Sequence, residues 1–218
     1  MAKPIHHAIN SVNKFGGKIE DYEPIHSLMD WSTSAHAKMA HRVVFHNEYG
    51  HSLVEDLVPM TVFNQDSGRL VYTRMVADQH TEEDLGFIPT LEDWDKEFDP
   101  KHEFVRARDI PFERHCEMSA EKFGGHPIEY QQIHEKMLEP KGPAGRLTFH
   151  SAFGVFIIEK LFGVYFKNTA GKVVSTRDVA EQHVLRTLRG IPSLTDWLAP
   201  IGKPWMAGSR KTTYMIVD

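Results

Sequence analysis

The sequence has a single cysteine, Cys116, among 218 residues. One cysteine cannot form a disulfide within the chain, so a disulfide-stapled secreted fold is excluded and a reducing compartment is expected. The chain also has no apolar run near the roughly 18 residues that a membrane-spanning helix needs, and its start, MAKPIHHAIN, lacks the apolar core of a signal peptide. We therefore expect a cytoplasmic protein with no membrane association.

Neither positively nor negatively charged residues dominate the sequence. The 25 lysines and arginines are interspersed with 30 aspartates and glutamates, for a formal net charge of −5. A nucleic-acid backbone is bound by clustered lysine and arginine, so nucleic acid is not an expected partner. With 41% hydrophobic and 25% charged residues, the composition is that of a globular protein that folds around an ordinary core.

The sequence does contain an internal repeat. The segment HAINSVNKFGG, which begins at His7, returns at His115 as HCEMSAEKFGG. Matching segments follow in the same order: DYEPIH with EYQQIH, HRVVFHNEYG with GRLTFHSAFG, RMVADQH with RDVAEQH, and GFIPTLEDW with RGIPSLTDW. A repeat of this kind indicates one structural unit built twice. It divides the chain into repeat copy 1 (7–96), an ordered connector (97–114), repeat copy 2 (115–198) and a C-terminal tail (199–218).

Each copy predicts the same order of elements. In copy 1 these are helices over 7–15 and 21–29, a long helix over 35–57, a hairpin around the turn at 64–68, a helix over 74–85 and a short helix through Trp94. In copy 2 the long helix spans 147–162 and is apolar on most sides. The expected fold is α+β and mainly helical, with two tandem copies of a helix-rich unit, one β-hairpin in each, packed with pseudo-twofold symmetry.

Several short motifs recur in both copies: KFGG, Tyr-x-x-Ile-His, a core-helix histidine with glycine four residues later, R-x-V-A-[DE]-Q-H, and Ile-Pro-[ST]-Leu-x-[DE]-Trp. This pattern, over residues 7–94 and 115–197, resembles a short domain of unknown function found in bacterial and phage proteins. The resemblance implies a phage or mobile-element context and no particular activity. The single domain carries an aspartate four residues after the Ile-His histidine. Copy 1 keeps it as Asp30, whereas copy 2 has Leu138, and Thr187 replaces Asp84.

Fourteen histidines are the one compositional excess, and several occupy matching positions of the two copies. Neutral imidazole and carboxylate are common ligands of zinc, iron, manganese and nickel. The candidate metal ligands are His26, Asp30, His46 and His80. The candidate residues for binding a small anionic ligand are Arg42, Arg74, His26, His46 and His80. No HExxH or CxxC motif supports either set, and no catalytic residue is assigned.

A structural interpretation competes with each of these assignments. A histidine beside an apolar helix face is more often a hydrogen-bonded core residue than a ligand. Arg74 with Asp78, and Arg177 with Glu181, have the i, i+4 spacing of an ion pair within one helix. KFGG is a helix stop, because it lacks the preceding strand of a phosphate-binding loop.

Three functions therefore stay open. The first is a binding or interaction protein with a His/Arg/acid-lined pocket for a small anionic ligand or a protein partner. The alternative is a metal-assisted hydrolase that acts on a phosphate or amide substrate, with a divalent metal ion as its cofactor. The third is an interaction or structural protein, in which the shared polar residues only hold the helices against the hairpin of each copy. Because copy 1 keeps Asp30 and Asp84, any ion or ligand is expected there, and the repeat is compatible with an oligomer.

Overall fold

The computed structural model describes residues 3–107, 109–199 and 201. This part of the chain consists of helices and two antiparallel two-stranded hairpins. It forms two compact units that divide the chain between Thr90 and Leu91, and each is described by itself. The expected mainly helical α+β fold, with one hairpin in each repeated unit, is confirmed. None of the described helices combines the length and apolar character needed to cross a bilayer.

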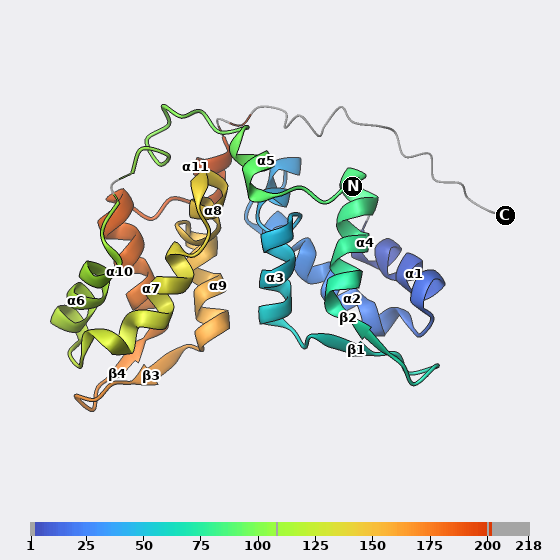
Figure 1. Cartoon of the computed structure of the whole chain (residues 1–218), viewed down its shortest axis with the longest axis horizontal. Coiled ribbons are helices and arrows are strands. Elements are labelled where there is room, and N and C mark those ends of the chain that lie inside the picture. The colour runs from blue at the N-terminus through green and yellow to red at the C-terminus, as the bar shows by residue number, and fades with distance from the viewer. Residues whose placement is uncertain (1–2, 108, 200, 202–218) are drawn as a thin grey trace. The chain divides into compact units, whose positions relative to one another are not determined.

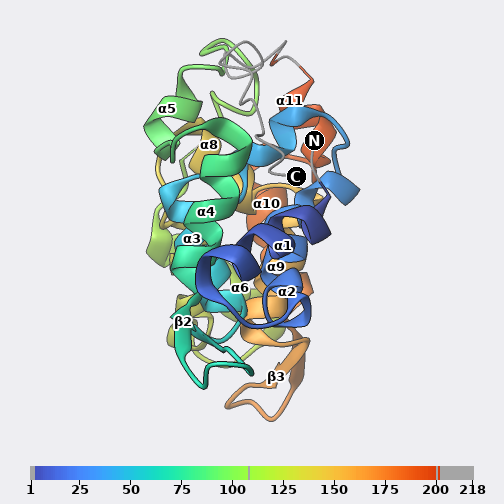
Figure 2. The ribbon, with the colours of Figure 1, turned by 90° about the vertical axis from the view of Figure 1, so that its right-hand side faces the viewer.

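Unit 1 is a helical layer with its hairpin at one end. Its elements are α1 (Pro4–Phe15), α2 (Ile19–Met29), the 3-10 helices η1 (Trp31–Ser34) and η2 (Met39–Val43), α3 (Glu48–Leu57), β1 (Thr61–Phe63), β2 (Leu70–Tyr72) and α4 (Thr73–Leu85). Both ribbon views show the β1–β2 hairpin beyond the lower ends of α3 and α4 (Figure 1, Figure 2). Helix α4 packs against α2 and α3, so polar residues of the three helices can meet in the interior.

Unit 2 repeats this order after two additional segments. Its elements are α5 (Leu91–Asp95), α6 (Phe112–Phe123), η3 (Pro127–Tyr130), α7 (Gln131–Leu138), α8 (Gly142–Phe149), α9 (Ala152–Phe162), β3 (Tyr165–Lys167), β4 (Val173–Ser175), α10 (Thr176–Leu188) and α11 (Leu194–Leu198). Helix α5 ends copy 1 in the sequence but packs against α8, and the backbone N–H of Ala144 donates to Asp95 at 2.7 Å.

The connector before α6 packs on unit 2. Phe98 is buried, and its ring lies 6.4 Å from that of Trp197. His102 and Phe104 add ring contacts to the same tryptophan. The tail expected over 199–218 lies outside the described residues except for Ala199 and Ile201.

The same hydrogen bond ties the end of the first helix to the element that follows it in each unit. The hydroxyl of Tyr22 donates to the carbonyl of Gly16 at 2.8 Å, and its counterpart Tyr130 donates to Gly124 at 2.6 Å. Gly16 and Gly124 have φ values of 77° and 86°, which favour glycine, and each ends its helix as the KFGG motif predicts. The repeated tyrosines and glycines therefore have a structural role.

The long helix expected in each copy is wrong. In unit 1 the range 35–57 contains the 3-10 helix η2 and then α3, and in unit 2 the range 147–162 is divided between α8 and α9. Asn47 caps α3 by accepting from the N–H of Gly50, and Ser151 caps α9 by accepting from Gly154. Asn and Ser are strong N-cap residues, so each favours a helix start inside the apolar run. The break places His46 fully in the interior of unit 1.

The two glycines permit this break. A Cβ atom on Gly50 would lie 2.6 Å from the Cα, C and O atoms of Phe45, and one on Gly154 would lie 2.5 Å from the Cα of Phe149. Both contacts are with backbone, which cannot rotate away as a side chain can.

We expect Gly50→Ala and Gly154→Ala each to lower the free energy of unfolding by about 1–3 kcal/mol, the usual cost of overpacking. Gly190→Ala is the control, because a Cβ atom there meets nothing within 4 Å. Chemical denaturation followed by circular dichroism measures the change. Equal stability of all three variants would show that the glycines are not needed for the close backbone contact.

Candidate metal centre in unit 1

Four side chains of unit 1 bring donor atoms within 4.8 Å of one another: Asp30 at the end of α2, His46 before α3, and His80 and Asp84 on α4. The Nε2 atom of His46 lies 3.8 Å from Asp30 Oδ1 and 3.4 Å from Asp84 Oδ2. His80 Nε2 lies 3.6 Å and 3.9 Å from the same two oxygens. Ligands held tetrahedrally at roughly 2.0–2.1 Å from an ion are about 3.4 Å apart, close to these distances.

The atoms that converge here have no hydrogen-bond partner of acceptable geometry among the described residues. They are Asp30 Oδ1, both ring nitrogens of His46, and His80 Nε2. Buried polar atoms nearly always have a partner, and each exception costs about 1–3 kcal/mol. A bound cation would satisfy Asp30 Oδ1 and the two Nε2 atoms together, so these residues fit a metal ion.

A chain of hydrogen bonds fixes which nitrogen of His80 carries its proton. Gln79 donates its Nε2 to Glu83 at 2.7 Å, so its Oε1 faces Ser11 and accepts the hydroxyl proton at 3.1 Å. Because Ser11 has only one hydrogen, its oxygen must accept from His26 Nε2, at 2.8 Å. His26 Nδ1 then accepts from His80 Nδ1 at 2.9 Å. This leaves His80 Nε2 with a lone pair directed at the donor cluster.

Two further histidines border the four donors. His41 donates Nδ1 to the carbonyl of Lys38 at 2.8 Å, and its Nε2 lies 3.6 Å from Asp30 Oδ1. His7 contacts Glu83 through Nδ1 at 2.6 Å, and its Nε2 lies 3.6 Å from Asp84 Oδ1. A carboxylate or carbonyl behind the far nitrogen is the usual support of a metal-ligating histidine.

Burial and neighbouring charges set the protonation of the cluster. Burial lowers the pKa of His46 to about 3 and also lowers the pKa of His80. Burial alone would raise the pKa of Asp30 and Asp84, but neighbouring histidines, and for Asp84 the guanidinium of Arg42, outweigh it and hold both below the usual range. Near neutral pH the cluster therefore contains neutral imidazoles and ionised carboxylates, the forms that bind metal.

The structure brings three of the four candidate metal ligands together and adds Asp84. The fourth, His26, lies behind His80, and both of its ring nitrogens face protein partners. Arg42 binds Asp84 Oδ2 at 2.5 Å, and both side chains are 4% exposed. The i, i+4 spacing of His80 and Asp84 on one helix face was the sequence signal for the added ligand.

Arg74 lies in a different setting. Its Nε donates to Asp78 at 3.1 Å and its Nη1 to Ser52 at 3.1 Å, so the ion pair expected within α4 is confirmed. The matched expectation in unit 2 is wrong, because Arg177 donates to Glu159 on α9 at 2.5 Å in place of Glu181. No described contact joins Arg74 to the four metal-ligand candidates.

The corresponding positions of unit 2 hold histidines without the two aspartates. His134 Nδ1 lies 2.9 Å from His183 Nδ1, and His183 Nε2 lies 3.2 Å from His150 Nε2. These imidazoles, with His115 beside them, face one another. Leu138 stands where Asp30 does, and the hydroxyl of Thr187 donates to its own helix at 3.0 Å. Unit 2 therefore offers a weaker ligand set than unit 1.

The buried histidines predict acid sensitivity of the metal-free protein. Burial lowers the pKa of eight of them: His26, His36, His46, His80, His115, His134, His150 and His183. As pH falls through about 6.5 the unfolded chain takes up protons that the folded chain refuses. The stability present above that pH is then lost at up to about 1.4 kcal/mol per pH unit for each histidine.

We expect the melting temperature to fall steeply between about pH 6.5 and pH 4. Thermal melts across this range, in buffers matched for ionic strength, measure it. A melting temperature that stays constant over the range would contradict the assigned neutrality of the buried imidazoles.

Comparison with known proteins agrees with the repeat. A family model described as Domain of unknown function (DUF6915) matches residues 2–104 and again residues 111–206. No curated protein and no solved structure matches the chain. Since the two matches cover most of the sequence, the protein belongs to the DUF6915 family and carries its domain twice.

Proposed function

We propose that the protein binds one divalent first-row transition-metal ion in unit 1, with Asp30, His46, His80 and Asp84 as ligands. The observation that carries the proposal is the convergence of buried donor atoms, of which Asp30 Oδ1 and the Nε2 atoms of His46 and His80 have no hydrogen-bond partner among the described residues. A set of two imidazoles and two carboxylates suits zinc, iron or manganese better than calcium or magnesium, which prefer oxygen ligands alone.

Charge balance supports the same proposal. Asp84 is paired with Arg42, whereas the described ion-pair contacts of Asp30 are all with histidines. Because the pKa of His46 and that of His80 are lowered, these histidines do not supply positive charge near neutral pH. A dication would offset the buried charge of Asp30, which is otherwise costly.

An anionic ligand at this site has less support. Arg42 and Arg74, the arginines that would hold it, are bound to Asp84 and Asp78 respectively. An incoming anion would have to displace a carboxylate in each case. Binding of a protein partner stays a prediction that no described contact addresses.

Metal-assisted hydrolysis is the second candidate function. Asp30 is the most exposed of the four ligand candidates, at 11% against 0% for His46 and His80. It therefore marks the side from which solvent or substrate would reach the centre. When bound, a divalent ion supplies a water of lowered pKa and a Lewis acid.

Metal content should depend on copy 1 alone. We expect tag-free protein to contain about one ion per chain by elemental analysis, and added Zn²⁺ to raise its melting temperature, because a ligand that binds only the folded state stabilises it. His46→Ala should lose both effects. His150→Ala, at the matched position of unit 2, should keep both, although it lowers stability by about 1–3 kcal/mol. Equal metal content in the two variants would contradict the proposed ligands.

The hydrogen-bond chain behind His80 gives a second test. Ser11→Ala removes the group that forces the proton of His26 onto Nε2, so His80 loses its fixed tautomer. We expect Zn²⁺ affinity to fall about 10- to 100-fold, as for other residues that orient metal ligands. Ser119→Ala makes the same change in unit 2, where Ser119 contacts His134 at 2.9 Å, and should leave the affinity unchanged. Competition with a chromophoric chelator measures both. An unchanged affinity in Ser11→Ala would show that the chain does not set the tautomer.

A further inference from the structure

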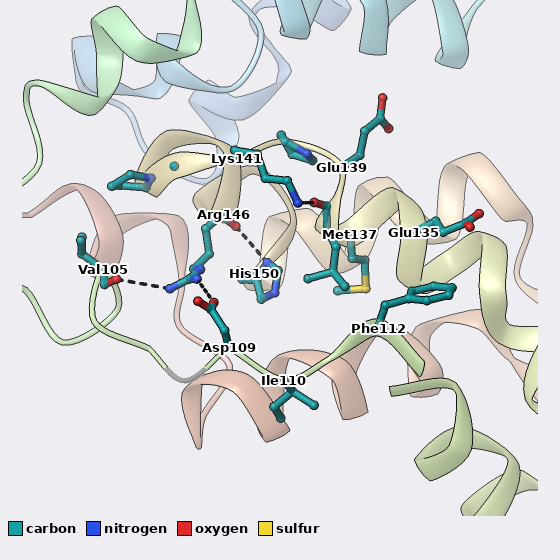
Figure 3. A pocket seen from close by; sticks show the side chains of 14 residues that line it. Val105, Asp109, Ile110, Phe112, Glu135, Met137, Glu139, Lys141, Arg146 and His150 are labelled. Atoms are coloured by element: carbon teal, nitrogen blue, oxygen red, sulfur yellow. Dashed lines mark hydrogen bonds and ion pairs between the residues drawn. The ribbon is translucent and has the colours of Figure 1, made fainter. Parts of the chain in front are cut away.

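Unit 2 contains a cavity of about 670 Å³ between the connector, α7 and the start of α8 (Figure 3). This volume lies within the range of about 300–1,000 Å³ that is typical of small-molecule sites. Much of its wall is apolar, formed by Val105, Ile110, Phe112, Met137, Leu138, Pro140 and Pro143. A ligand with an apolar body would be favoured here over a fully hydrated one.

The guanidinium of Arg146, in the cavity wall, is paired with an exposed aspartate, Asp109. Arg146 directs Nη2 to Asp109 Oδ1 at 2.6 Å, and Figure 3 shows the two side chains meeting at the cavity. The side chain of Asp109 is 90% exposed, and that of Arg146 is 21% exposed. The other contacts of the guanidinium are carbonyl oxygens of the connector at 3.3–3.4 Å. An ion pair with so exposed an aspartate adds little stability, so another carboxylate can replace it.

Comparison of the two copies explains why this cation faces the cavity. In unit 1 the matched Arg42 is bound by the buried Asp84. Thr187 takes that position in unit 2 and bonds to its own helix, so Arg146 has no buried carboxylate beside it and turns to the connector. The other exchange, Leu138 for Asp30, adds an apolar side chain to the cavity wall. The two exchanges that remove the metal ligands thus also create an apolar wall beside a replaceable ion pair.

The other charged groups of the wall have partners of their own. Glu135 accepts from Gln131 at 2.7 Å, and Glu139 pairs with Lys136 at 2.9 Å. Lys141 donates to the carbonyl of Leu138 at 3.1 Å. Of the lysine and arginine in the wall, Arg146 is the one whose described contacts include a carboxylate, that of the exposed Asp109.

We propose that unit 2 binds a small monocarboxylate with an apolar body in this cavity. The carboxylate takes the place of Asp109 on Arg146, in the geometry that the aspartate already shows, and the apolar body lies against Leu138, Met137 and Ile110. A single guanidinium suits one carboxylate, whereas a phosphate ester is usually held by several donors. The site is independent of the metal centre, which uses residues of unit 1 alone.

Octanoate is a suitable probe, with 1-octanol as the uncharged control of matched chain length. Titration into ¹⁵N-labelled full-length protein, followed by NMR chemical shifts, should give saturable changes at residues of α7 and the connector. Octanol should bind at least about 10-fold more weakly, because it lacks the charge-assisted bond to Arg146.

Three variants make the test specific. Arg146→Met should weaken octanoate binding about 10-fold or more, while Arg42→Met, the matched change in unit 1, should not alter it. Asp109→Ala removes the competing carboxylate on an exposed side chain and should tighten binding. Absence of saturable binding in both the wild type and Asp109→Ala would overturn the proposal. So would equal affinity for octanoate and octanol, or an Arg146→Met variant that folds and binds as well as the wild type.

Discussion

The contact of a glycine Cα with a neighbouring backbone is the constraint on which each unit depends. Gly50 and Gly154 lie in the first turns of α3 and α9, so close to the backbone of the preceding residues that a methyl group has no room. The break in the helix turns His46 inward in unit 1 and His150 inward in unit 2. In this position His46 meets His80 of α4, and His150 meets His183 of α10, the helices that follow the hairpins.

Around this constraint the protein buries an unusual amount of imidazole. Each unit joins its histidines through serine, glutamine and one another, so most ring nitrogens have a partner although water is excluded. The exceptions cluster in unit 1, where Asp30 and Asp84 add charge to the same space. Asp30 and Asp84 therefore distinguish the cluster of imidazoles and carboxylates in unit 1 from the imidazole network of unit 2.

Much of the fold could be predicted because it rests on local signals. The KFGG helix stops, the hairpins and the Ser193–Asp196 capping box all depend on residues close in sequence, and the structure contains them. The prediction of one long helix in each copy was wrong. Apolar residues continue on both sides of Asn47 and Ser151, and this continuity hides the helix starts that the two cap residues favour. The sequence could not show which group each ring nitrogen of the buried histidines bonds to. Whether His26 ligates or supports His80 is decided by Ser11 and Gln79, which come from two other helices.

The position of α5 has a consequence for the modularity of the chain. By sequence, α5 closes the first repeat, yet Asp95 caps the start of α8 in unit 2 through the N–H of Ala144. The first repeat therefore ends after α5 in the sequence, whereas the first compact unit ends before α5 in the structure. Excising a single repeat at its sequence boundary would take that cap away from its neighbour, whereas a cut after Thr90 would respect the packing. The helix that ends the first repeat in the sequence thus belongs to the second unit in the structure, so a stand-alone relative of the second repeat would need another way to cap the start of α8.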